Sequence, residues 1–129
     1  MSIHKEEKIY DLVIVGGGPI GIACALEAKK NGLSYVILEK GTLVNSLYNY
    51  PSNMTFFSTS EKLELDEIPF ISTNPKPHKQ EALEYYRRIV TSKHLNIHLF
   101  EKVEKVETRE DNLHHISSNK AAYTCKNVI

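Results

Sequence analysis

Cysteine is scarce in this sequence, and neither sign of charge is in excess. The two cysteines, Cys24 and Cys125, lie far apart and match neither a CxxC pair nor a metal-ligand spacing, so we expect two isolated, buried thiols. That pattern favours the reducing cytoplasm over an oxidising compartment. Sixteen basic side chains balance sixteen acidic ones, so no global field is expected to attract nucleic acid or an anionic membrane.

Hydrophobic segments long enough for a membrane are not expected either. The apolar stretch over residues 12–26 is too short to span a bilayer and contains four glycines. The charged start, "MSIHKEEKIYD", has no apolar segment typical of a signal peptide. No histidine has HExxH spacing or a carboxylate at ligand spacing, and no Ser-His-Asp arrangement is evident, so we predict no metal site and no catalytic residue.

What the sequence does contain is a strand–helix–strand pattern near its start. The β-branched run over residues 9–15 predicts a strand buried on both faces. A glycine-rich turn follows at 16–21, then an alanine-rich helix at 22–30 that ends at Asn31-Gly32. A second buried strand is expected over 35–39. Such a βαβ unit belongs to a parallel sheet and has a right-handed crossover.

Three glycines in the turn fit the GxGxxG pattern of dinucleotide-binding units. Gly16 permits the sharp turn, Gly18 lets a pyrophosphate approach the backbone, and Gly21 lets the helix pack tightly on the sheet. The helix N-terminus would direct N–H groups and a positive dipole end at the phosphates. Glu39 would accept hydrogen bonds from a ribose diol and would repel a 2′-phosphate, which disfavours NADP. The pattern alone does not separate FAD from NAD.

The remaining sequence predicts a long polar and aromatic loop over 41–77, with a short helical turn at 59–64. A helix is expected over 79–94 and a strand over 96–100. Three strand-like pieces, "KVEKVET", "LHHISS" and "AAYTC", predict a small antiparallel meander. The end, "KNVI", predicts a new buried strand that is cut off.

These elements predict an α/β fold, a Rossmann-type FAD-binding domain that occupies residues 1–129. It has a parallel sheet, a crossover helix and a three-stranded β-meander, and we expect it to be incomplete. The same layout is found in the FAD domain of two-dinucleotide flavoproteins, which is an analogy of architecture.

Three segments carry a more specific resemblance: "YDLVIVGGGPIGIACALEAKKNG", "LYNYPSNMTFFSTSEKLEL" and "EALEYYRR". Over about residues 9–107 the chain resembles the N-terminal part of the thioredoxin-reductase-like flavoproteins, and most of all the branch named for bacillithiol-disulfide reductase. The resemblance implies FAD in this domain, NADPH in a second domain that this chain lacks, a small-molecule or protein disulfide as substrate, and a homodimer. The cofactor-binding positions that it implies are Gly16, Gly18, Pro19 and Gly21 at the pyrophosphate, Glu39 and Lys40 at the adenosine ribose, Asn45 and Asn49 toward the flavin, and Val103 at the adenine.

The chain departs from the family pattern at two points. The bacillithiol branch commonly has a cysteine, a suspected redox residue, where this chain has Ile20, and Cys24 one turn later does not replace it. The chain also stops where the family's FAD domain continues. Two other functions therefore remain open: a flavin monooxygenase-like or NAD-binding oxidoreductase, and a non-catalytic nucleotide-binding Rossmann domain.

Overall fold

The computed structural model describes residues 8–45, 63–72 and 76–129. Asn49 and most of the helical turn expected at 59–64 lie outside these residues. In chain order the elements are β1 (Ile9–Val15), α1 (Pro19–Lys30), β2 (Tyr35–Leu38), α4 (Lys79–Ser92), β3 (Ile97–His98), β4 (Val103–Thr108), β5 (His114–Ser118) and β6 (Ala122–Val128).

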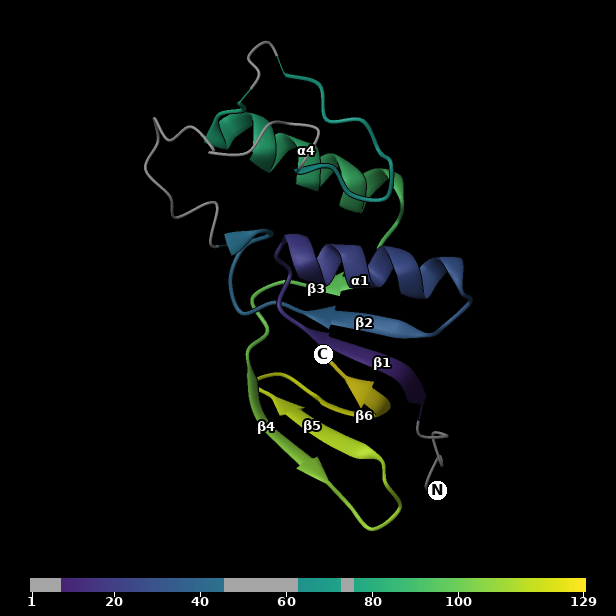
Figure 1. The fold of residues 1–129 in the computed structure, drawn as a ribbon. Helices are drawn as coiled ribbons and strands as arrows, with labels where there is room; N and C mark the ends of the chain where they lie inside the picture. The colour runs from purple at the N-terminus through teal and green to yellow at the C-terminus, as the bar shows by residue number, and fades with distance from the viewer. Residues whose placement is uncertain (1–7, 46–62, 73–75) are drawn as a thin grey trace, which may run out of the picture.

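The strands form one six-stranded mixed sheet in the order β3-β2-β1-β6-β5-β4. Strands β3, β2, β1 and β6 run parallel, whereas β4, β5 and β6 form the antiparallel meander. In Figure 1, α1 lies between the parallel strands and α4, and the meander extends from the opposite end of the sheet. The predicted α/β fold with a crossover helix and a meander is confirmed.

The first helix begins earlier than the sequence pattern predicts. It starts at Pro19 with Gly18 as its N-cap, not at residue 22, so Gly21 lies inside the first turn. Proline suits this position because its missing N–H would have no helical partner there and its φ is already helical. The helix ends as predicted, since Asn31 caps it and Gly32 follows at a φ of 68°.

The C-terminal part of the sheet differs more from the prediction. The third meander piece and the separate strand expected at "KNVI" are one continuous strand, β6. Its first half pairs with β5 from Ala122 to Cys125, and β1 pairs with it from Thr124 to Val128. No glycine or proline interrupts the chain at this point, so the strand runs on from one partner to the other.

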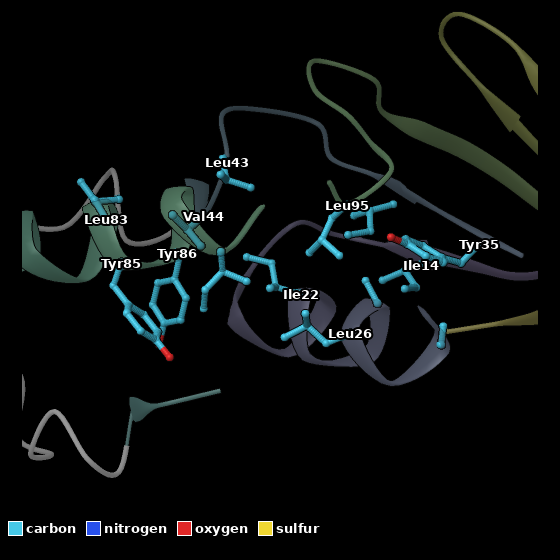
Figure 2. Close-up of a cluster of buried hydrophobic side chains, with 14 of the residues drawn as sticks. Ile14, Ile22, Leu26, Tyr35, Leu43, Val44, Leu83, Tyr85, Tyr86 and Leu95 are labelled. Carbon is cyan, nitrogen blue, oxygen red and sulfur yellow. The ribbon is translucent and has the colours of Figure 1, made fainter. Parts of the chain in front are cut away.

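The two faces of the sheet bury different residues of the same strands. Leu12, Ile14 and Ile37 pack beneath α1 and α4 in the larger core cluster, part of which Figure 2 shows. Their neighbours Val13 and Val36 point to the other face and pack against the meander. This alternation follows from the period of two along a strand. It explains why these strands are continuously apolar in sequence.

The two cysteines have different environments. Cys125, in β6, is fully buried in the smaller core cluster with Val13 and Ile116, as expected. Cys24 is only half-buried, with one side against the larger cluster, so the prediction that it is a core residue is correct only in part.

Alkaline pH is expected to destabilise the fold through Tyr86 in α4. Its side chain is 2% exposed, its hydroxyl donates to the carbonyl of Leu63 at 3.1 Å, and burial raises its pKa to about 12. An unfolded tyrosine ionises near pH 10, so its stabilising contribution is complete below that pH and is lost as pH rises toward the folded pKa. We expect the free energy of unfolding to fall by about 3 kcal/mol between about pH 10 and about pH 12 from this residue.

Urea denaturation at a series of pH values measures this loss. The matched variant Tyr86→Phe keeps the ring and is expected to lose about 1 kcal/mol at neutral pH with its hydrogen bond. Its stability should then change less than that of the unaltered chain above pH 10. Equal alkaline losses in the two proteins would exclude Tyr86 as the cause.

Candidate functional site

The carboxyl ends of the parallel strands meet at one edge of the sheet. Gly16 follows β1 and its N–H donates to the carbonyl of Leu38 at 2.9 Å. Glu39 follows β2 and its N–H donates to the carbonyl of His98, the last residue of β3, at 3.0 Å. In open α/β sheets, ligands bind outside this edge. At this edge the glycine turn lies next to Glu39, the residue predicted to bind the ribose.

The three motif glycines are required for different reasons. Gly16 has a φ of 110°, a conformation that favours glycine. A Cβ on Gly21 would overlap the carbonyl oxygen of Gly16, so the close packing of α1 on the end of β1 demands glycine. A Cβ on Gly18 would meet nothing within 4 Å. Packing within the described residues therefore does not require glycine at 18, and the space in front of its backbone is open.

That open space is a cavity of about 250 Å³ between the turn and the start of α1, lined in part by Val15, Gly16, Gly18 and Ile20. No side chain among the described residues caps the N-terminus of α1, and its first turn contains no acidic residue. The positive end of the helix dipole therefore faces the cavity with no carboxylate in the helix's own first turn. This combination favours an anion such as a pyrophosphate.

The carboxylate of Glu39 lies against the turn rather than away from it. Its side chain accepts hydrogen bonds from two backbone N–H groups: Oε1 from Gly17 at 2.8 Å and Oε2 from Gly41 at 2.6 Å. The residue is 6% exposed. Each oxygen has a second lone pair, so the carboxylate retains acceptor capacity for a hydroxyl group. Besides the expected ribose contact, Glu39 thus holds the glycine turn to the loop after β2.

Gly17 is a site residue that the sequence reasoning missed. A Cβ there would lie 2.9 Å from Ile97 Cδ1 and 3.2 Å from Glu39 Cβ. Its carbonyl also accepts the N–H of Val44 at 2.9 Å. The signal in the sequence was a glycine at position 17, which the GxGxxG motif leaves unspecified. Its reason lies in β3 and in the loop after β2, which are distant in the chain.

Removing the Glu39 carboxylate is expected to destabilise the fold as well as the site. Glu39→Ala leaves the N–H groups of Gly17 and Gly41 without their acceptor, at a cost of about 3 kcal/mol of unfolding free energy. Glu39→Gln keeps one acceptor oxygen and should cost about half as much. Urea denaturation followed by circular dichroism measures both. Glu104→Ala, which removes an exposed carboxylate in β4, is the control and should match the unaltered chain; an equally stable Glu39→Ala variant would contradict the structural role.

Three of the other predicted cofactor residues, Pro19, Lys40 and Asn45, lie around this centre. Pro19 begins α1, Lys40 is exposed beside Glu39, and Asn45 packs over Gly41 with its Oδ1 3.4 Å from the Thr42 hydroxyl. Asn49 lies outside the described residues.

Val103, the residue predicted at the adenine, begins β4, and its side chain packs against the cluster that contains Val36. The pairing of β4 with β5 is irregular between Val103 and Lys105. Bulges of this kind frequently lie beside functional sites because they redirect the backbone.

A second, apolar cavity of about 480 Å³ runs along the outer face of α1. Ile20, Ala23 and Cys24 contribute to its lining, and Ile20 is 78% exposed. The opposite face of the helix buries Ile22, Ala25 and Leu26 in the core. A helix that is apolar on both faces is typical of one covered on both sides. We call this second surface, lined by residues 20, 23 and 24 with Leu33 and Ile129, the outer groove.

Neither a metal site nor a membrane-spanning helix is found in the part of the chain that the structure describes. Within residues 8–45, 63–72 and 76–129, no cluster of three histidine, cysteine, aspartate or glutamate side chains could hold a metal ion. The helices in this part of the chain are too short or too polar to cross a bilayer.

Comparison with known proteins agrees with the geometry. Residues 13–129 match the family described as pyridine nucleotide-disulphide oxidoreductase. The chain belongs to this family. Over 112 residues it is 45% identical to the bacilliredoxin reductase Bdr of Bacillus subtilis (strain 168). This alignment covers 87% of this chain and 35% of the relative. It is 34% identical over 100 residues to the thioredoxin reductase of Mycoplasma genitalium.

Solved structures give the same result. The bacillithiol disulfide reductase Bdr from Staphylococcus aureus superposes with a TM-score of 0.89 at 40% identity, over 95% of this chain and 38% of that one. The resemblance to the bacillithiol-disulfide-reductase branch is therefore confirmed. A flavin monooxygenase from Stenotrophomonas maltophilia has a TM-score of 0.88 at 21% identity, which shows the shared fold alone. The chain spans about a third of the length of these relatives.

Proposed function

We propose that this chain is the FAD-binding part of an NAD(P)H-dependent flavoprotein that reduces a disulfide. The observation that carries the proposal is the open space at Gly18, which faces an uncapped helix N-terminus and lies one residue from the amide that Glu39 holds. A dinucleotide needs this arrangement at its pyrophosphate and ribose. Identities of 45% and 40% to Bdr proteins, whose names specify bacilliredoxin and bacillithiol disulfide, support a disulfide as the substrate class.

In this proposal each residue contributes binding and orientation. The amides around Gly16, Gly18 and Gly21, with Pro19 shaping the helix start, hold the pyrophosphate. Glu39 accepts from the adenosine ribose. Lys40 stands beside it, Asn45 and Asn49 line the path toward the flavin, and the backbone of Val103 contacts the adenine. Bound FAD would accept a hydride from the nicotinamide and pass the electron pair to the disulfide; that chemistry belongs to the cofactor.

We further propose that the intact enzyme is a cytoplasmic homodimer. NADPH, the disulfide and the second subunit would bind to polypeptide beyond this chain. The relatives are longer than this chain, which covers 35% to 38% of them. The outer groove supports the proposal from within the chain, since an apolar helix face this exposed needs a cover. Packing of further chain on Ile20 and Ile129 would provide it.

Titration of the ¹⁵N-labelled chain, followed by amide chemical shifts, tests FAD binding. Glycine amides resonate apart from most others, so the turn can be observed even when binding is weak. FAD is expected to shift the amides of Gly16, Gly18 and Gly21, and FMN, which has no pyrophosphate or adenosine, should not. NADPH should bind less tightly than FAD because Glu39 repels a 2′-phosphate. Equal responses to FAD and FMN, or none to FAD, would contradict the proposal.

The activity itself is tested on a protein extended to the length of the relatives. We expect NADPH oxidation that depends on an added disulfide, with bacillithiol disulfide and an oxidised bacilliredoxin as the compounds to compare. NADH in place of NADPH determines the nicotinamide preference. Oxidation of NADPH with hydroxylation of an organic substrate, and no reduction of disulfides, would favour the monooxygenase alternative.

A further inference from the structure

A second buried carboxylate lies outside the glycine turn. Glu101 lies in the segment between β3 and β4, and its side chain is 5% exposed. Its Oε2 accepts hydrogen bonds from the hydroxyls of Ser118 at 2.6 Å and Tyr123 at 2.5 Å. Its Oε1 lies 3.3 Å from His98 Nδ1. A buried carboxylate is tolerated only when its oxygens are satisfied in this way.

These partners keep the carboxyl group ionised. Burial raises the pKa of Glu101, but the hydrogen bonds from Ser118 and Tyr123, with the nearby His98, outweigh burial and lower the pKa below its ordinary value. The pKa of Tyr123 is raised in turn, by burial first and then by the hydrogen bond to Glu101. At neutral pH the carboxylate therefore accepts and the two hydroxyls donate.

The partners come from three different strands. His98 ends β3, Ser118 ends β5 and Tyr123 lies in β6. The backbone N–H of Glu101 donates to the carbonyl of Glu39 at 2.8 Å. One residue thus ties the carboxyl end of the parallel strands to the turn between β5 and β6. In Figure 1 the segment from β3 to β4 passes beside that turn, and reciprocal hydrogen bonds between Lys102 and Asn119 hold it there.

The backbone around Glu101 is unusual on both sides. Phe100, directly before it, has a φ of 54° although it is not glycine, and its N–H donates to the carbonyl of Gly41 at 3.1 Å. Non-glycine residues in this region are strained and persist only where their surroundings fix them. Two residues after Glu101, Val103 begins β4, whose pairing with β5 is irregular. The network thus lies between a strained bend and an irregular strand start, and the backbone of Glu101 is hydrogen-bonded to Glu39.

We propose that Glu101 is a positioning residue for the adenosine end of the cofactor, because it sets the backbone of Val103 relative to Glu39. The inference rests on the proposed FAD site and adds a residue to it. Glu101 itself would not touch the cofactor. Its contribution is to keep the start of β4 beside the end of β2. The backbone of Val103 and the carboxylate of Glu39 are then both in position to contact the adenine and the ribose.

The test uses the variant Glu101→Gln, which removes the negative charge that strengthens the hydrogen bonds from Ser118 and Tyr123. Its amide oxygen can still accept both hydroxyls, but more weakly, and its NH₂ group replaces the oxygen that faces His98. Three probes are titrated into the ¹⁵N-labelled chain: FAD, ADP and inorganic pyrophosphate. We expect the affinity for FAD and ADP to fall about tenfold, which corresponds to roughly one lost hydrogen bond, with the affinity for pyrophosphate unchanged. The matched control Glu107→Gln removes an exposed carboxylate from the same meander and should bind all probes normally.

The selective loss separates positioning from a merely structural role, because general destabilisation would weaken all three probes together. Equal losses for every probe, or an unchanged affinity for ADP, would overturn the inference while leaving the FAD site intact. If the unaltered chain binds none of the probes, the proposed function and the inference both fail. If Glu101→Gln does not fold, Tyr123→Phe is used instead, because it removes only one donor to the carboxylate. This variant should show the same selective loss of ADP affinity, but a smaller one.

Discussion

Gly21→Ala is expected to lower the free energy of unfolding by about 3 kcal/mol or more, which is a large part of the stability of a small domain. The added Cβ would overlap the carbonyl oxygen of Gly16 and lie 3.2 Å from its carbonyl carbon and 3.3 Å from Ile14 Cγ2. Two of these three atoms are backbone at the end of a buried strand, so no rotamer change relieves the overlap. The helix must move off the sheet, which weakens the packing of Ile22 and Leu26.

Urea denaturation followed by far-ultraviolet circular dichroism measures this loss. Gly18→Ala is the matched control, since it makes the same substitution at the start of the same helix. Its Cβ meets nothing within 4 Å and its φ of −85° is ordinary for alanine, so its stability should stay within about 1 kcal/mol of the unaltered chain. A Gly21→Ala variant as stable as Gly18→Ala would show that α1 shifts freely, against the tight packing that the structure describes.

The same Gly18→Ala variant should lose cofactor binding while it keeps its fold. The methyl group would occupy the space in front of the backbone where a pyrophosphate must approach, and we expect the affinity for FAD to fall about 100-fold, or about 2.7 kcal/mol. The amide-shift titration provides the measurement, with circular dichroism to confirm the fold. FAD binding that is unaffected by the methyl group would mean that the open space at Gly18 is not the pyrophosphate site, and the proposed function would lose the observation that carries it.

Some of the structure was predictable residue by residue. β1 has the bounds that the β-branched run predicted, and α1 ends where Asn31-Gly32 predicted. The structure places Gly16, Gly18, Gly21 and Glu39 at one edge of the sheet, as a βαβ unit requires. These features depend on backbone preferences and on the pattern of apolar residues within about thirty residues, and both can be read from a single sequence.

Other features depend on partners that are distant in the chain. The local sequence does not show whether residues 122–128 form two strands or the single strand β6. The strand is continuous because its second half pairs with β1, which is distant in the chain. Gly17 is explained by Ile97 and Glu39, and Glu101 by hydroxyls on two later strands. Each of these residues is ordinary when seen only among its neighbours in sequence.

The sequence by itself determined the strand–turn–helix start, the crossover and the family, because those follow from local conformational preference and a contiguous motif. Only the tertiary structure decided that Glu39 clamps the turn it was expected to serve, that α1 exposes a second apolar face, and that Glu101 joins the two halves of the sheet. The physical reason is that burial, hydrogen-bond partnership and steric clearance are properties of pairs of residues, and the pairs here are formed by strands that the chain places far apart.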